Sequence, residues 1–156
     1  MKRRTLVLSA VALLAAVAVC FAATGDAFIG TWKLDAAKSK IAAGTGTNTT
    51  VVYSRDGANL KCVIDGTGTD GKPTHSEWTG KLDGKAYPVT GDPLVNMRSY
   101  RVINDHTMTA SEMQGTKVVI TARIAVSADG MTRTVTVTQT DDKGMKHTST
   151  AVYNKQ

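Results

Sequence analysis

The stretch "KVVITARIAVSADGMTRTVTVTQTDDKGMKHTSTAVYNK", residues 117–155, decides the fold class. It contains three runs rich in Thr, Val and Ile, which favour extended backbone. The runs are separated by "ADG" and "DDKG", whose Gly and Asp residues supply the backbone angles that tight hairpin turns require. Apolar and polar residues alternate in the first run, which predicts a strand with one buried face. That face carries Val118, Ile120, Ala122, Ile124 and Val126.

The same pattern extends upstream, with further runs of this kind at "IGTWKL", "TTVVYSR", "NLKCVIDG", "THSEWTGKL", "KAYPV", "RSYRVIN" and "TMTASEMQ". Consecutive hairpins without long crossover connections indicate an up-and-down meander, and closure of that sheet removes its exposed edges. We therefore predict an all-β fold, an antiparallel up-and-down barrel of about eight to ten strands. A two-sheet sandwich remains an alternative. "DAAKSKIAAG", from Asp35 to Gly44, predicts either a short helix between those two residues or a loop.

The first residues have the pattern of a secretory signal peptide. "MKRR" is a positive start, "TLVLSAVALLAAVAV" an apolar run, and "CFAATGDA" an exit rich in small residues. Cleavage after Ala22 or Ala27 fits this pattern, and we favour Ala22. Residues 1–22 are then a signal peptide, and residues 23–156 form one barrel domain. We expect the mature protein to be periplasmic or secreted.

Cys20 allows a second interpretation, as the lipidated first residue of a bacterial lipoprotein. Val19 precedes it, where such a site needs a small residue, so we favour ordinary cleavage. The apolar run is shorter than the ~20 residues that cross a bilayer, and we expect no transmembrane span in the mature protein.

The charge of the mature chain is modest. Lys2, Arg3 and Arg4 leave with the signal peptide, which reduces the formal charge of +6 by three. No concentrated basic stripe with stacking aromatic residues is present, so we do not expect nucleic-acid binding. Cys62 is then the remaining cysteine, and its alternating neighbours predict a buried, unpaired thiol. We expect a monomer.

Both ends of the mature chain resemble known β-barrels. "AFIGTWKL" resembles the first strand of the calycins, which include the lipocalins and the intracellular fatty-acid-binding proteins. That resemblance implies that Trp32 closes the base of the barrel and that Gly30 lets the backbone pass close to a neighbouring strand. "STAVYNKQ" resembles the last strand of the fatty-acid-binding proteins, with Tyr153 at the position of a ligand-binding tyrosine. Ala151 stands where that family has its carboxylate-binding arginine.

Three internal segments extend the resemblance over most of the mature chain. "GTWKLDAAKSK", "DGKAYPVTGDP" and "VSADGMTRTVTVTQTDDKG" are similar to small exported bacterial proteins described as lipocalin-like, a group without assigned activity. The resemblance implies a calycin-like barrel and brings no known ligand.

Sequence signals of catalysis are missing. There is no Gly-x-Ser-x-Gly nucleophile turn, and the Gly-rich runs precede strands rather than a helix that could hold a phosphate. His75, His106 and His147 lie on different predicted strands without metal-ligand spacing. We therefore expect neither an enzyme, nor a metal site, nor a cofactor.

A barrel of about ten strands encloses more space than its own side chains fill. We accordingly predict an exported binding protein for a small apolar or amphipathic ligand in the cell envelope. The alternative is an interaction or inhibitor protein that acts through its outer surface and loops. The residues predicted to line the interior are Tyr53, Trp78, Tyr100, Met108 and Tyr153, with Arg133 as a polar contact.

Arg133 has two interpretations. It shares an alternation face with Met131, Val135 and Val137. If that face is the interior, Arg133 is a buried cation that requires an acidic partner or an anionic ligand group. Otherwise it lies at the mouth of a strand, where its stem covers apolar surface.

Overall fold

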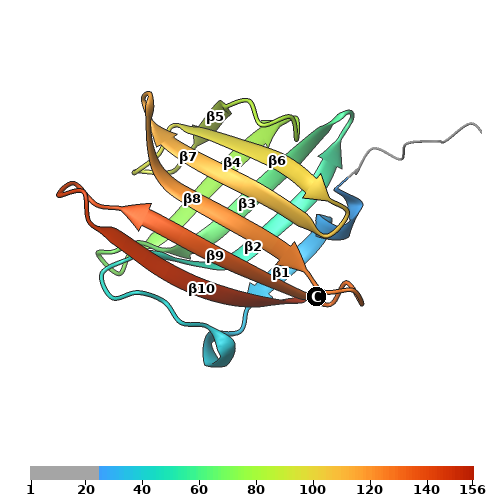
Figure 1. Cartoon of the computed structure of the whole chain (residues 1–156), viewed down its shortest axis with the longest axis horizontal. Helices are drawn as coiled ribbons and strands as arrows, with labels where there is room; N and C mark the ends of the chain where they lie inside the picture. Colours follow the sequence, from blue (N-terminus) through green and yellow to red (C-terminus); the bar gives the residue numbers. More distant parts are fainter. Residues whose placement is uncertain (1–24) are drawn as a thin grey trace, which may run out of the picture.

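A computed structural model describes residues 25–156, and the predicted signal peptide with Cys20 lies outside this range. Ten antiparallel strands form one closed barrel in which neighbours follow the order of the chain, with β1 beside β10 (Figure 1). This confirms the predicted up-and-down barrel and excludes the two-sheet sandwich. The strands are β1 (Gly30–Leu34), β2 (Thr47–Asp56), β3 (Asn59–Thr67), β4 (Pro73–Gly80), β5 (Tyr87–Thr90), β6 (Met97–Asn104), β7 (Thr107–Gln114), β8 (Lys117–Val126), β9 (Thr132–Thr140) and β10 (Lys146–Lys155).

The hairpin between β9 and β10 shows how the turn residues act. Gly144 has a φ of 80°, in the left-handed region that glycine adopts without strain. Asp141 precedes it, and its Oδ1 accepts hydrogen bonds from the backbone nitrogens of Lys143 and Met145 at 2.9 and 2.8 Å. The Asp141 side chain therefore stabilises the turn in which it lies, as the sequence "DDKG" predicts.

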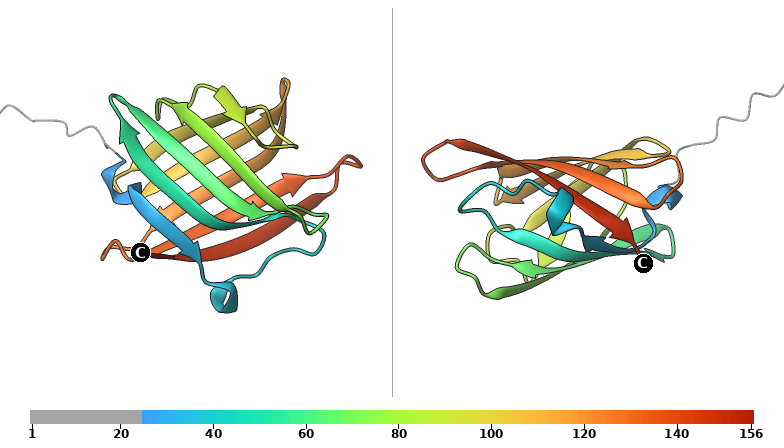
Figure 2. Two further views of the ribbon diagram at one scale, coloured as in Figure 1. Left: turned by 180° about the vertical axis from the view of Figure 1, so that it is seen from behind. Right: turned by 90° about the horizontal axis from the view of Figure 1, so that it is seen from below.

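The seam between β1 and β10 closes the barrel, with Trp32 opposite Lys155 and Leu34 opposite Tyr153 (Figure 2). β1 ends at Leu34, but the chain after it stays beside β10 as far as Lys40 without forming a further strand. The backbone of Lys40 exchanges hydrogen bonds with Thr150 at 2.7 and 2.8 Å. Ser39 Oγ accepts a bond from the Val152 nitrogen at 2.9 Å.

Helical structure in the described residues is limited to two 3₁₀ helices, η1 (Asp26–Phe28) and η2 (Ala36–Lys38). Asp35 caps η2, since its Oδ1 accepts a hydrogen bond from the Lys38 nitrogen at 3.3 Å. The short helix allowed by the sequence is thus present as a single turn with Asp35 as its N-cap, but it ends at Lys38 and not at Gly44. Neither helix of residues 25–156 has the length and hydropathy needed to cross a membrane.

One end of the barrel is packed beneath η1. Trp32 and Phe28 are completely buried there, and Trp32 Nε1 donates a hydrogen bond to the Phe28 carbonyl at 2.8 Å. Gly30 has a φ of 130°, and a Cβ at this position would lie 2.7 Å from Cε of Lys155. The absence of a side chain at Gly30 therefore makes room for Lys155, whose Nζ lies 5.2 Å from the centroid of the Trp32 ring.

The alternation read from the sequence matches the buried face over most of its length. Leu60, Cys62 and Ile64 of β3 are all buried, and Cys62 is a free cysteine. Val118 departs from the prediction, since 44% of it is exposed. The β7–β8 ladder shifts register between Glu112 and Met113, so the first residues of β8 no longer follow the alternation of the rest.

Candidate functional site

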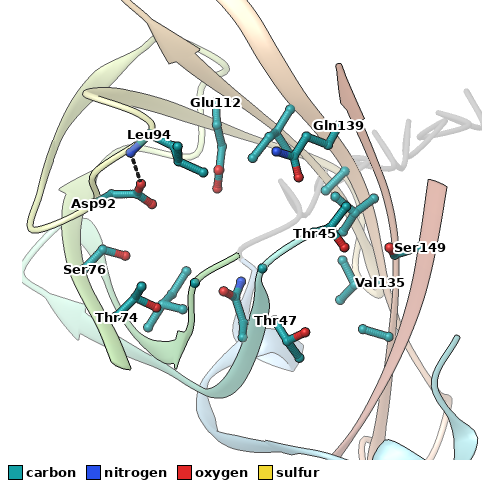
Figure 3. A pocket seen from close by; sticks show the side chains of 18 of the residues that line it. Thr45, Thr47, Thr74, Ser76, Asp92, Leu94, Glu112, Val135, Gln139 and Ser149 are labelled. Carbon is teal, nitrogen blue, oxygen red and sulfur yellow. Dashed lines mark hydrogen bonds between the residues drawn. The ribbon is translucent and has the colours of Figure 1, made fainter. Parts of the chain in front are cut away.

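The barrel contains a cavity of about 520 Å³. It is lined by residues of the loops between β3 and β4 and between β5 and β6, and by the segment that follows η2 (Figure 3). Most of the inward positions of β8 and β9 that line it carry aliphatic side chains, and the polar ones are Arg133 and Gln139 of β9. The aliphatic residues are Ile120, Ala122, Ile124, Val135 and Val137.

The mouth of the cavity carries polar and charged side chains. Figure 3 shows Thr74, Ser76, Asp92 and Gln139 around the opening. Asp92 shapes the β5–β6 loop, because its Oδ1 accepts a hydrogen bond from the Leu94 nitrogen at 2.8 Å. The same loop leaves the Leu94 side chain largely exposed at the mouth.

Two tyrosines and a thiol form a buried polar cluster within the barrel. Tyr53 donates a hydrogen bond to the Tyr100 hydroxyl at 3.4 Å, and Cys62 Sγ lies 3.6 Å from the same hydroxyl. The two rings meet edge to face with centroids 5.9 Å apart. Burial raises the pKa of both phenols and of the Cys62 thiol. These three groups are therefore neutral at physiological pH.

Arg98 of β6 is buried beside two carboxylates. Its Nε lies 2.7 Å from Oε1 of Glu112 on β7, and its Nη2 lies 3.8 Å from Oδ2 of Asp92. Glu112 is opposite Arg98 in the β6–β7 ladder, so the sheet register itself brings this pair together. Burial raises the pKa of Glu112, although the neighbouring guanidinium opposes that shift.

Arg133 of β9 lies between two aromatic rings. Its guanidinium carbon is 4.6 Å from the centroid of Tyr153 and 5.2 Å from that of Tyr53. The Tyr153 hydroxyl donates to the Asn48 carbonyl at 3.1 Å, which joins β10 to β2. The structure thus buries Arg133 in the interior rather than placing its head group in solvent.

Four of the six residues predicted to line a cavity do so together, namely Tyr53, Tyr100, Arg133 and Tyr153. Trp78 and Met108 point inward and are buried, but they belong to the packed core and do not line the described cavity. Trp78 supports the lining from behind, because its Nε1 donates to the Arg98 carbonyl at 2.9 Å. Its ring also packs edge to face against Tyr100 at 4.8 Å.

Sequence reasoning missed the charged group formed by Arg98, Glu112 and Asp92. A signal for two of them was present, since Arg98 shares an alternation face with Tyr100 and Glu112 shares one with Met108. Tyr100 and Met108 were predicted to face inward, so Arg98, two positions from the first, and Glu112, four positions from the second, must do so as well. Asp92 lies in a loop, where alternation gives no information.

The outer wall carries a separate ionic group on β3 and β4. His75 Nδ1 lies 2.7 Å from Oδ1 of Asp65. Nζ of Lys61 forms an ion pair with Oε2 of Glu77 at 2.8 Å. Hydrogen bonds to Asp65 and Glu77 raise the pKa of His75. Among residues 25–156, no three His, Cys, Asp or Glu side chains are arranged to hold a metal ion.

The barrel is similar to solved structures of redesigned proteins. A structure described as EF1p2_mFAP2b bound to DFHBI has a TM-score of 0.51 and 11% identity, and covers 86% of this chain and 98% of its own. A redesigned β-barrel, mFAP1, bound to DFHBI has a TM-score of 0.48 and 14% identity, with coverage of 86% and 100%. At this identity the first similarity shows a shared barrel fold. No protein-family model and no curated protein matches the chain.

Proposed function

We propose that the protein is an exported binding protein that holds a small apolar or amphipathic molecule inside its barrel. The observation that carries this proposal is the cavity of about 520 Å³. Small-molecule pockets in proteins occupy roughly 300 to 1,000 Å³ and combine an apolar lining with a few polar groups. Aliphatic side chains of β8 and β9 with buried tyrosine and arginine groups form such a lining.

The chemistry of the interior supports binding rather than catalysis. Cys62 is the strongest nucleophile type in the cluster, but burial raises its pKa and keeps it as a thiol. Its described neighbour is the Tyr100 hydroxyl, whose pKa burial also raises. A neutral phenol is not a base that could activate the neutral thiol beside it.

Export is supported by the basic and apolar pattern of residues 1–22. Intact mass spectrometry of protein from the envelope or medium of its host tests it. We expect a chain that begins after Ala22, or after Ala27. A full-length chain confined to the cytoplasm would contradict export.

Ligand binding is tested first on the native protein. Native mass spectrometry of protein purified from its own host should show a retained small molecule. Independently, the uncharged fluorescent probe N-phenyl-naphthylamine should bind with an increase in emission, and organic extracts of the native protein should displace it. A protein that is empty and ignores apolar probes would favour the alternative, action through the outer surface.

A matched pair of variants on β8 locates the bound probe. Ala122 lines the cavity, whereas the adjacent Thr121 is exposed on the outer face. Ala122→Phe should fill part of the cavity and weaken probe binding, while Thr121→Phe should leave it unchanged. Equal effects of the two variants would place the probe outside the barrel.

A further inference from the structure

Two arginine side chains line the cavity and are almost completely removed from solvent. Arg98 is 1% exposed and Arg133 is 4% exposed. A buried charge is unfavourable unless a counter-charge or hydrogen bonds compensate for its lost hydration. The two arginines differ in whether a carboxylate lies nearby to compensate the charge.

Arg98 is compensated by the protein itself. Two carboxylates approach it, Glu112 at 2.7 Å and Asp92 at 3.8 Å. Both acidic side chains also line the cavity, toward the mouth (Figure 3). This side of the cavity therefore carries at least as much negative as positive charge and does not attract an anion.

Arg133 has no such compensation within residues 25–156. Its buried Nε and Nη1 have no hydrogen-bond partner among these residues, as is also true of the same atoms of Arg98. The difference is that Arg133 forms no ion pair there, whereas two carboxylates lie beside Arg98. The rings of Tyr153 and Tyr53 lie 4.6 and 5.2 Å from the guanidinium carbon. Ring faces attract a cation, but they accept no hydrogen bonds from its in-plane N–H groups.

The two tyrosines also supply no negative charge. Burial raises the pKa of Tyr53 and of Tyr153, against the opposing influence of Arg133, so both phenols stay neutral. Their hydroxyls are engaged elsewhere, one with Tyr100 and the other with the Asn48 carbonyl. The N–H edges of Arg133 thus remain for a group from outside the chain.

We infer that Arg133 is the binding site for the anionic group of the ligand, and that the ligand is an amphiphile with a single negative charge. This inference rests on the proposed function and names its ligand class. A carboxylate or a sulfonate carries one negative charge and presents oxygens in the plane of a guanidinium. The charged group of the ligand meets the N–H edge of Arg133, whose guanidinium lies against the rings of Tyr53 and Tyr153. The apolar body extends along Ile120, Ala122 and Val137 toward the mouth.

Two fluorescent probes that differ only in charge test the inference. Anilinonaphthalene sulfonate carries a sulfonate that its parent, N-phenyl-naphthylamine, lacks. We expect the wild-type protein to bind the sulfonate more tightly by roughly ten- to hundredfold, the range that a charge-assisted hydrogen bond supplies. Competition with decanoate and with naphthoate then distinguishes an aliphatic from an aromatic body, and displacement by either supports an anionic ligand.

Arg133→Met should abolish the preference for the sulfonate while retaining N-phenyl-naphthylamine binding. Arg133→Lys, which keeps the charge but loses the planar fork, should retain part of the preference. Arg123→Met removes an exposed arginine from the neighbouring strand β8 and should change neither affinity.

The outcomes separate this inference from the proposed function. Equal wild-type affinity for the two probes, or a preference that survives in Arg133→Met, would overturn the inference and leave intrabarrel binding standing. Binding of neither probe would contradict both. The wild-type comparison needs no variant, so equal affinities overturn the inference even if Arg133→Met does not fold. In that case Arg133→Lys is the variant that tests the position, and an unchanged sulfonate preference in it would also contradict binding by the planar guanidinium.

Discussion

Arg133 and Tyr153 are directly opposite each other in the β9–β10 ladder, and the Arg133 guanidinium carbon lies 4.6 Å from the centroid of the tyrosine ring. The register of one hairpin therefore sets the position of the cation in the cavity. Tyr53, which reaches it from β2, fixes a second side at 5.2 Å. The guanidinium is thus in contact with side chains from strands on both sides of the closing seam.

Replacement of Arg133 tests whether this site is built for a ligand rather than for stability. Arg133→Met removes a buried cation that has no acidic partner among residues 25–156, and it also removes two cation–π contacts. Because uncompensated burial of charge is unfavourable, we expect the unfolding free energy of the ligand-free protein to stay equal or rise by about 1 kcal/mol. Urea denaturation measures it. A loss of more than about 2 kcal/mol would assign Arg133 a mainly structural role.

Unlike replacement of Arg133, disruption of the Arg98–Glu112 ion pair should lower the unfolding free energy. Glu112→Gln leaves Arg98 buried with Asp92 alone, at 3.8 Å. Removal of one partner of a buried ion pair typically destabilises a protein by about 3–5 kcal/mol. Urea denaturation should show a loss near the lower end of that range. Glu77→Gln, in an exposed pair with Lys61, is the control and should have a much smaller effect.

Trp32 should contribute strongly to stability, because it is completely buried and its indole nitrogen is hydrogen-bonded to Phe28. We expect Trp32→Ala to lower the unfolding free energy by about 3–5 kcal/mol. Thermal or urea unfolding checks this value. Ile103→Ala, at a site that is 51% exposed, serves as the control and should change stability by less than about 0.5 kcal/mol.

Cys62 should react slowly with thiol reagents in the native protein. The side chain is fully buried, and burial raises its pKa, so little thiolate is present and access is blocked. Labelling followed by mass spectrometry should be slow in buffer and rapid in urea. Rapid native labelling at the same rate as in urea would show that the interior opens readily.

His75 gives the outer wall a pH dependence. Its pKa lies above the ordinary value of 6.5 because Asp65 and then Glu77 accept hydrogen bonds from its ring. The protonated form is thus favoured in the folded state, and its stabilising contribution is complete below pH 6.5 and lost as the pH rises through the folded pKa. NMR titration should find the raised pKa, and Asp65→Asn should lower it. An unchanged pKa in that variant would exclude the Asp65 contact as the cause.

The fold could be predicted because a period of two and glycine-containing turns are local properties. Alternation also assigned Tyr53, Tyr100 and Tyr153 to the inner face. Alternation does not show which inward side chains border the cavity and which belong to the packed core. Trp78 and Met108 were therefore predicted to line the cavity, although they are buried in the core.

Two further features cannot be predicted from the residue pattern within single strands. The register shift beside Glu112 arises between strands, so the exposure of Val118 is not visible in one strand alone. The contrast between Arg98 and Arg133 depends on which acidic residue lies on a neighbouring strand. Alternation within a single strand carries no information on this, and only the β6–β7 ladder places Glu112 beside Arg98.

The seam between β1 and β10 has a consequence for the folding of the protein. Trp32 pairs with Lys155, and the nitrogen of Gln156 donates to the Thr31 carbonyl at 2.9 Å. The first strand thus finds one of its two partners in a strand that the other eight strands separate from it along the chain. Closure therefore depends on contacts between residues far apart in sequence, and such contacts form slowly. A chain truncated before Lys146 would have an open edge on β9 as well as on β1, and is expected to aggregate rather than to accumulate as a smaller barrel.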